Sequence, residues 1–311
     1  MRVHKTLTPR ASTGPSAAGS RSAAGPVTPS PPVSPPVDLE HARAVALAAA
    51  AEAGELIFAR VTGALGVRAK SETGDVVTDL DLAAEGVIVD HIRSAFPRHR
   101  IVAEESGLLD AADESWVWLV DPLDGTNNVA IGLSDYVVGI ALCHDGVPVL
   151  GVVHDPVRGE SWSAVQGQGT SGPRGPVRPQ YREPAHPVLA WAQGYEVGRG
   201  NEAARALRVV LESSSRRVLQ LWAPLLAWVL LARGDIDGFV GYRAEAIDLP
   251  AGSLIAREAG IVVRGFDGEP FDDRFDLPHD RSFVAGHPRT IPGLLELVHS
   301  AEGITIGGLP G

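Results

Sequence analysis

The chain has 311 residues, of which 44% are hydrophobic and 21% are charged, and its formal net charge at pH 7 is −11. This length and this apolar content are sufficient for one large domain or for two smaller lobes. Residues 1–37 hold four basic side chains and no acidic one, so the rest of the chain carries a net charge of −15. That balance argues against general nucleic-acid binding by the folded part.

Residues 1–37 are rich in Pro, Ser, Ala and Gly, which cannot bury a core, and we predict that they form a disordered tail. An acid-free segment with Arg and Ser is also typical of an organelle transit peptide, but no clear amphipathic face is present, which favours a dispensable extension. The single cysteine, Cys143, excludes an intrachain disulfide and indicates a cytoplasmic protein.

After the tail, helical and strand patterns alternate along the chain. Residues 38–60 predict a helix capped by Asp38 and rich in Ala and Leu, and residues 80–95 predict a second helix that ends before Pro97. We assign residues 38–180 to an N-terminal α+β lobe and residues 181–311 to a C-terminal α/β lobe.

Strands are predicted for residues 136–143 and 147–153, paired around a turn, and residues 160–164 would extend the same sheet. The Gly- and Pro-rich residues 167–187 are interpreted as a mobile connection between the lobes. The apolar run 222–232 is too short to span a bilayer and predicts a buried helix, so no membrane partner is expected.

The most informative stretch is residues 118–128, because it joins a buried strand to a polar turn. Residues 118–120 predict the strand, and Asp121 and Asp124 follow it directly. Asp-Gly pairs elsewhere in the chain are explained by simple turns. The pair Asp124-Gly125 is more informative because a second aspartate and a predicted strand precede it. Gly125 lets the backbone amides turn outward, where they can meet a phosphate.

Acidic segments before and after this turn support a metal site. Residues 74–81 and 101–106 lie before this turn, and residues 247–252 lie after it. Carboxylate oxygens are the ligands that Mg²⁺ prefers, and several packed carboxylates would repel one another without it. A solvated loop at Glu104–Glu105 and a helix N-cap at Asp248 are the structural alternatives.

With these motifs the chain resembles the inositol monophosphatase family of Mg²⁺-dependent, lithium-sensitive sugar phosphatases, over residues 38–299. The resemblance implies a layered α-β-α-β-α sandwich of the inositol monophosphatase and fructose bisphosphatase type, within the α/β (α+β) class. It also implies a homodimer and two or three Mg²⁺ ions per site, with Mn²⁺ as an alternative.

The resemblance implies a role for each motif residue. The metal ligands would be Glu104, Asp121, the backbone carbonyl of Leu123, Asp124 and Asp248, with Asp121 bridging two ions. The amides of Gly125 and Thr126 would bind the phosphate. Catalysis would rest on Thr126, Asp81 and Glu104, which would activate the attacking water. Supporting roles would fall to Lys70, Asp75 and Glu105.

The expected activity is therefore hydrolysis of a small phosphate monoester, of a sugar, cyclitol or related alcohol, by metal-activated water. Asp79 and Asp81 have the spacing of a phosphoaspartate motif, but they open a helix instead of closing a strand, which weighs against a covalent mechanism. A non-catalytic binding or regulatory protein on the same fold is the competing hypothesis.

The residues expected to contact the alcohol part of the substrate depart from the family pattern. Gly241 stands where inositol-hydrolysing relatives have a glutamate, Trp222 stands in a normally small Gly-Ser or Gly-Thr pair, and Arg243 lies in the rebuilt segment. These changes make histidinol phosphate, fructose 1,6-bisphosphate and 3′-phosphoadenosine 5′-phosphate alternative substrates.

Overall fold

The computed structural model describes residues 37–63, 66–70, 76–181, 185–276 and 280–304. The chain separates into two units, Met1–Pro35 and Pro36–Gly311, and the second is described below. Nearly all of the predicted tail, and the supporting residue Asp75, lie outside the described residues.

Seven helices and fifteen strands are present in the described part of the chain. The helices are α1 (Leu39–Arg60), α2 (Asp79–Ala95), α3 (Thr126–Ala130), α4 (Glu202–Ser214), α5 (Pro224–Arg233), α6 (Pro250–Glu258) and α7 (Ile291–Ser300). The strands are β1 (Arg68–Ala69), β2 (Val76–Val77), β3 (His99–Ala103), β4 (Gly107–Leu109), β5 (Asp113–Asp124), β6 (Val137–His144), β7 (Val147–Asp155), β8 (Glu160–Val165), β9 (Gly169–Gly172), β10 (Gly175–Val177), β11 (Val188–Gln193), β12 (Arg217–Leu219), β13 (Gly238–Tyr242), β14 (Val262–Gly265) and β15 (Phe283–Gly286).

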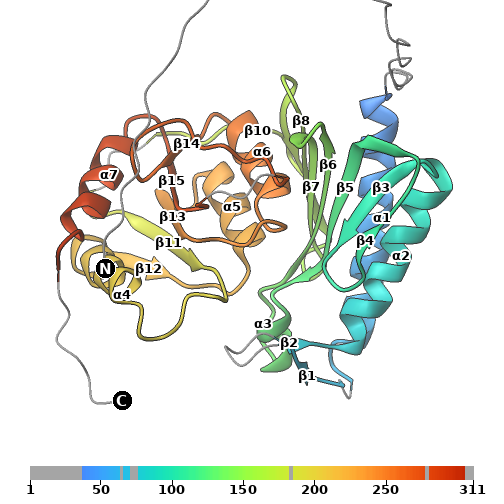
Figure 1. Cartoon of the computed structure of the whole chain (residues 1–311), viewed down its shortest axis with the longest axis horizontal. Helices are drawn as coiled ribbons and strands as arrows, with labels where there is room; N and C mark the ends of the chain where they lie inside the picture. Colours follow the sequence, from blue (N-terminus) through green and yellow to red (C-terminus); the bar gives the residue numbers. More distant parts are fainter. Residues whose placement is uncertain (1–36, 64–65, 71–75, 182–184, 277–279, 305–311) are drawn as a thin grey trace, which may run out of the picture. The chain divides into compact units, whose positions relative to one another are not determined.

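The first large sheet has eight strands in the order β10-β9-β8-β7-β6-β5-β3-β4 (Figure 1). Its pairs are antiparallel except for β3 and β5, which are parallel. Alternate side chains of β5 point to opposite faces, as expected for a strand buried on both sides. Val117 and Leu119 enter one core, whereas Trp118 and Val120 enter another.

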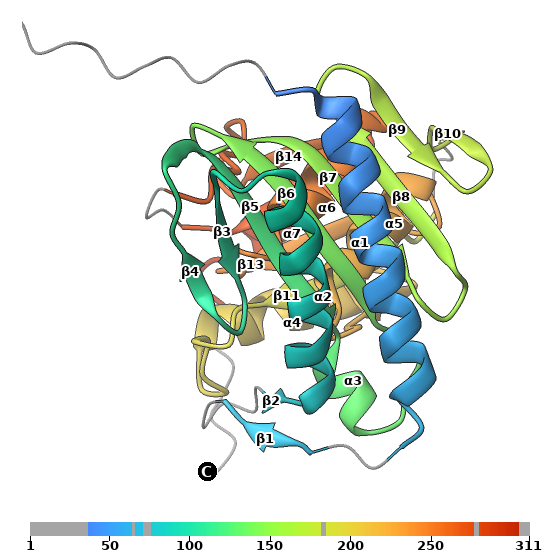
Figure 2. The same cartoon turned by 90° about the vertical axis from the view of Figure 1, so that its right-hand side faces the viewer.

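Helices α1 and α2 cover one face of this sheet and lie side by side across it (Figure 2). The buried face of α1 is mostly alanine, which lets its backbone approach the sheet closely. A Cβ atom at Gly54 of α1 would lie 2.5 Å from the His154 ring of β7, so a larger residue would push the helix away.

Helices α5 and α6 pack between the first sheet and a second sheet of order β12-β11-β13-β15-β14. Helices α4 and α7 cover the outer face of the second sheet. The layers therefore run α1/α2, sheet, α5/α6, sheet, α4/α7, and the predicted α-β-α-β-α sandwich is confirmed.

The predicted N-terminal helices are confirmed almost to the residue. Asp38 caps α1 by accepting hydrogen bonds from the amides of Glu40 and His41. Helix α2 begins at Asp79, one residue earlier than predicted, because Thr78 caps it in a capping box with Asp81.

The expectation of a mobile connection between the lobes is wrong in part. The expected mobile connection at 167–187 contains the β9–β10 hairpin, since its glycines turn the chain instead of loosening it. Helix α5 begins at Pro224, two residues after Trp222, within the run predicted to be a buried helix. The cap position of α6 is Leu249, one residue after Asp248.

No helix in the described ranges is both long enough and apolar enough to cross a bilayer, and the buried helix predicted at 222–232 is confirmed as α5, packed between the two sheets.

Candidate active site

The site is built on the turn from β5 into α3. Asp121 and Asp124 are the last acidic residues of β5, and both are buried. Gly125 follows with φ +109°, and a Cβ atom on it would lie 2.7 Å from the carbonyl oxygen of Asp135. Only glycine suits both conditions. Thr126 is the first residue of α3.

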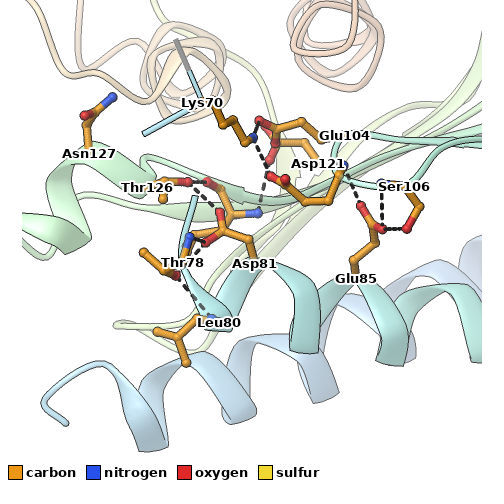
Figure 3. A network of polar contacts seen from close by, with 12 residues as sticks. Lys70, Thr78, Leu80, Asp81, Glu85, Glu104, Ser106, Asp121, Thr126 and Asn127 are labelled. Carbon is orange, nitrogen blue, oxygen red and sulfur yellow. Dashed lines mark hydrogen bonds and ion pairs between the residues drawn. The ribbon is translucent and has the colours of Figure 1, made fainter. Parts of the chain in front are cut away.

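Thr126 connects this turn to helix α2 (Figure 3). Its Oγ1 lies 2.7 Å from Asp81 Oδ1 and 2.9 Å from the carbonyl oxygen of Leu123. A hydroxyl has one proton, so Thr126 donates to one of these two acceptors at a time. All three residues are buried.

Asp81 is fixed in place by Thr78. The Thr78 amide and hydroxyl donate to Asp81 Oδ2 over 2.8 and 2.6 Å, while Oδ1 faces Thr126. Three donors thus face this carboxylate at the start of a helix, and Asp81 is positioned to orient the Thr126 hydroxyl.

Four carboxylates interact around this turn. Burial raises the pKa of Asp121 well above its ordinary value, and the charges of Glu104, Asp124 and Asp248 raise it further. Burial likewise raises the pKa of Asp124, and Asp248 adds to that effect. Asp248, from the second half of the chain, therefore interacts with the carboxylates at the end of β5 in the first sheet.

Lys70 supplies positive charge on one side of the cluster. Its ammonium lies 2.7 Å from Glu104 Oε1 and also forms an ion pair with Glu105. Burial acts to lower the Lys70 pKa, but the two carboxylates outweigh burial and raise it. Burial raises the pKa of Glu105 to about 7, although the hydrogen bond from Lys70 acts against this.

These residues suit a hard divalent cation, which would relieve the mutual repulsion of buried carboxylates. Yet no three His, Cys, Asp or Glu side chains in the described ranges are already gathered as a coordination shell. Other donors hold them instead. The Leu123 amide donates to Asp121 over 3.1 Å, and the Leu225 amide donates to Asp124 over 2.7 Å.

Sequence reasoning missed two buried residues that support the site. Glu85 accepts hydrogen bonds from the amides of Glu105 and Ser106, over 2.8 and 3.1 Å, and it also bonds the Ser106 hydroxyl. Asn128 donates to the carbonyl oxygen of Leu221 over 2.6 Å. The available signal for Glu85 was its position four residues after Asp81, on the apolar face of α2.

The expected substrate-pocket residues have unusual backbone or packing. Trp222 and Arg243 adopt positive φ, +53° and +48°, which is rare for residues with large side chains. Gly241 is buried in β13, and a Cβ atom on it would lie 2.2 Å from the Phe283 ring. Phe283 thus fills the space that a side chain at position 241 would need.

Known proteins resemble this chain over nearly all of its described part. It is 32% identical to Nus factor SuhB of Escherichia coli K12 over 254 residues, which are 81% of this chain and 93% of the relative. A crystal structure of extragenic suppressor protein SuhB from Bartonella henselae has a TM-score of 0.75 at 26% identity, covering 84% of this chain and 98% of that one.

Inositol monophosphatase from Anabaena (Nostoc) sp. PCC 7120 has a TM-score of 0.72 at 27% identity, covering 85% of this chain and 97% of that one. The model of the inositol monophosphatase family matches residues 38–302, which include every described residue of the acidic cluster and the Thr126 turn. The chain belongs to the inositol monophosphatase family.

Proposed function

We propose that this chain is a Mg²⁺-dependent phosphomonoesterase that hydrolyses a small sugar, cyclitol or related alcohol phosphate. The observation that carries the proposal is the Thr126–Asp81 contact of 2.7 Å, placed beside the buried carboxylates of Asp121 and Asp124. A scaffold protein would gain nothing from burying carboxylates that repel one another.

In this proposal some residues of the site orient and deprotonate a water molecule, and others bind the phosphate. With its proton directed to Asp81, the Thr126 oxygen can accept a hydrogen bond from a water molecule and orient it. Glu104 lies across the site, paired with Lys70, and can take part in removing a proton from that water. The N-terminal end of α3 would hold the phosphate through the amides of Gly125 and Thr126.

Glu104, Asp121, Asp124, Asp248 and the carbonyl of Leu123 would hold Mg²⁺, with Mn²⁺ as an alternative. When bound, the divalent ions supply positive charge that neutralises the phosphate and lowers the pKa of water. The number of ions, two or three, can be counted by titration calorimetry with Mg²⁺ on the full chain.

The test is phosphate release from inositol 1-phosphate, histidinol phosphate, fructose 1,6-bisphosphate and 3′-phosphoadenosine 5′-phosphate, with Mg²⁺ and with EDTA. We expect Mg²⁺-dependent turnover of at least one ester. Asp121→Asn should abolish it, and Thr126→Ala should lower kcat roughly 100-fold or more. Asp145→Asn is the matched control, because Asp145 lies in an exposed turn and should retain full activity. Release that persists in EDTA would contradict the proposal.

A binding or regulatory role is the second candidate, because the Escherichia coli relative is named a Nus factor. Under that alternative, Asp121→Asn would leave function in the cell intact although the variant binds no metal. Complementation of a deletion strain by Asp121→Asn and by the wild type separates the two candidates.

We also propose that the protein acts in the cytoplasm as a homodimer. The only cysteine is buried and unpaired, which suits a reducing compartment, and the family resemblance implies the dimer. Sedimentation equilibrium of the full chain would give the mass directly, and a monomer at micromolar concentration would contradict the dimer.

A further inference from the structure

Trp222 is the only one of the six tryptophans that is substantially exposed. It is 52% exposed, whereas the other five are at most 7% exposed. A bulky aromatic residue with φ +53° has a strained backbone, and this one is also exposed to solvent. Neither feature stabilises the fold. Strain of this kind persists only where the surroundings impose it, and it is concentrated at functional sites.

The backbone on both sides of Trp222 is attached to the catalytic turn. Before it, the carbonyl oxygen of Leu221 accepts a hydrogen bond of 2.6 Å from Asn128. After it, the amide of Leu225 donates to Asp124 over 2.7 Å. Residues 221–225 are therefore attached at two points to the turn that is proposed to hold the phosphate, and Trp222 lies between those two points.

A second aromatic residue is attached to the same turn from another direction. Asn127 donates a hydrogen bond of 3.2 Å to the hydroxyl of Tyr195, which is 38% exposed. The Tyr195 amide donates to Glu245 over 2.9 Å, three residues before Asp248. Two exposed aromatic side chains thus belong to segments bonded to residues 124–128.

From this arrangement we propose that the alcohol part of the substrate carries a planar aromatic ring, which stacks on Trp222 while the phosphate occupies the turn at Gly125–Thr126. The inference rests on the proposed phosphatase function. Aromatic faces attract one another in offset or edge-to-face geometry, beyond the effect of buried area alone. A saturated ring such as a cyclitol has no such face.

The first experiment compares 2-phenylethyl phosphate with 2-cyclohexylethyl phosphate on the full chain with Mg²⁺. The two esters have the same linker and ring size and differ in ring planarity and π electrons. We expect kcat/KM to be about three- to tenfold higher for the phenyl ester, mostly through a lower KM. Equal values for the two esters would overturn the inference while leaving the phosphatase proposal standing.

Variants at position 222 test whether Trp222 causes the preference for the phenyl ester. Trp222→Phe should keep the ratio of the two kcat/KM values, and Trp222→Gly should bring it close to one. Glycine accepts φ +53° without strain, so Trp222→Gly should fold. Phe58→Ala is the control, because Phe58 is 53% exposed on α1 and should not change the ratio. A preference that survives Trp222→Gly would contradict the role of this residue.

Fluorescence gives a readout that does not depend on turnover. Acrylamide should quench mainly Trp222, since the other tryptophans are buried. The phenyl ester should protect this signal at about three- to tenfold lower concentration than the cyclohexyl ester. If neither ester is hydrolysed but the phenyl ester protects Trp222 selectively, the ring-binding inference stands, and the phosphatase proposal is decided separately by the panel of four natural esters. Equal protection, or none, overturns the inference.

Discussion

At the scale of single residues, the site depends on two buried carboxylates that each accept several hydrogen bonds, Asp81 and Glu85. Asp81 accepts hydrogen bonds from Thr78 and Thr126, and Glu85 accepts one from an amide of the loop after β3. Both carboxylates are buried. A buried acceptor of this kind stabilises the fold chiefly because its removal would leave the surrounding donors buried without a hydrogen-bond partner. Its contribution is therefore visible only when it is deleted.

Glu85→Ala should show this effect. The substitution leaves the amides of Glu105 and Ser106 without their acceptor, so the free energy of unfolding should fall by about 2–4 kcal/mol. Activity should fall as well, because Glu104 lies at the start of the same loop. Urea denaturation and phosphate release measure the two effects.

Ser106→Ala is the matched control for Glu85→Ala. It removes one hydroxyl donor and leaves Glu85 bonded to both amides, so the loss should stay near 1 kcal/mol. Equal losses for the two variants would mean that Glu85 does not organise the loop.

At the scale of elements, close packing determines where the last aspartate lies. Helix α6 begins two residues after Asp248 and packs against β7. A Cβ atom at Gly151 of β7 would lie 2.6 Å from the carbonyl oxygen of Ala251, which is backbone and cannot rotate away. The absence of a side chain at position 151 thus fixes how near α6 comes to the sheet.

Gly151→Ala should therefore destabilise the fold by about 1–3 kcal/mol and lower activity by displacing α6. Gly86→Ala provides the control, because Gly86 lies within α2 and a Cβ atom there would meet nothing within 4 Å. That change should stabilise the protein by about 0.5–1 kcal/mol and leave activity intact. Thermal unfolding of both variants would reveal opposite signs, and a harmless Gly151→Ala would refute the packing argument.

At the scale of the whole molecule, the acidic cluster joins distant parts of the chain. Asp124 ends a strand of the first sheet, Asp248 precedes α6, and each disfavours the charge of the other. The metal-free protein therefore folds against this repulsion. Divalent ions should stabilise it by relieving the repulsion, beyond the stabilisation that any ligand gives.

Asp124→Asn should separate these effects. In EDTA the variant should melt higher than the wild type, by about 2–4 °C for each 1 kcal/mol of repulsion removed, and the amide oxygen can still accept from Leu225. Mg²⁺ should raise the melting temperature of the wild type and have little effect on the variant. A variant that melts lower in EDTA would show that the cluster carries less charge than the structure indicates.

The sequence by itself determined the limits of the two N-terminal helices, because these depend on local signals, and its motifs carried the resemblance that implied the family and the layered fold. Asp38 and Thr78 cap their helices, alternation along β5 defines two buried faces, and the turn after Val120 requires a glycine. The proximity of Asp121, Asp124 and Thr126 also follows from the sequence, since one turn contains them all.

Only the tertiary structure decided which distant residues complete the site. Glu85 and Asn128 look like ordinary helix residues until the fold places them against the loops that they bond. Trp222, with its positive φ, lies between two such attachments, the Leu221 carbonyl to Asn128 and the Leu225 amide to Asp124. Long-range contacts of this kind leave no periodic pattern in the chain, because the residues that they join are 20 to 101 positions apart.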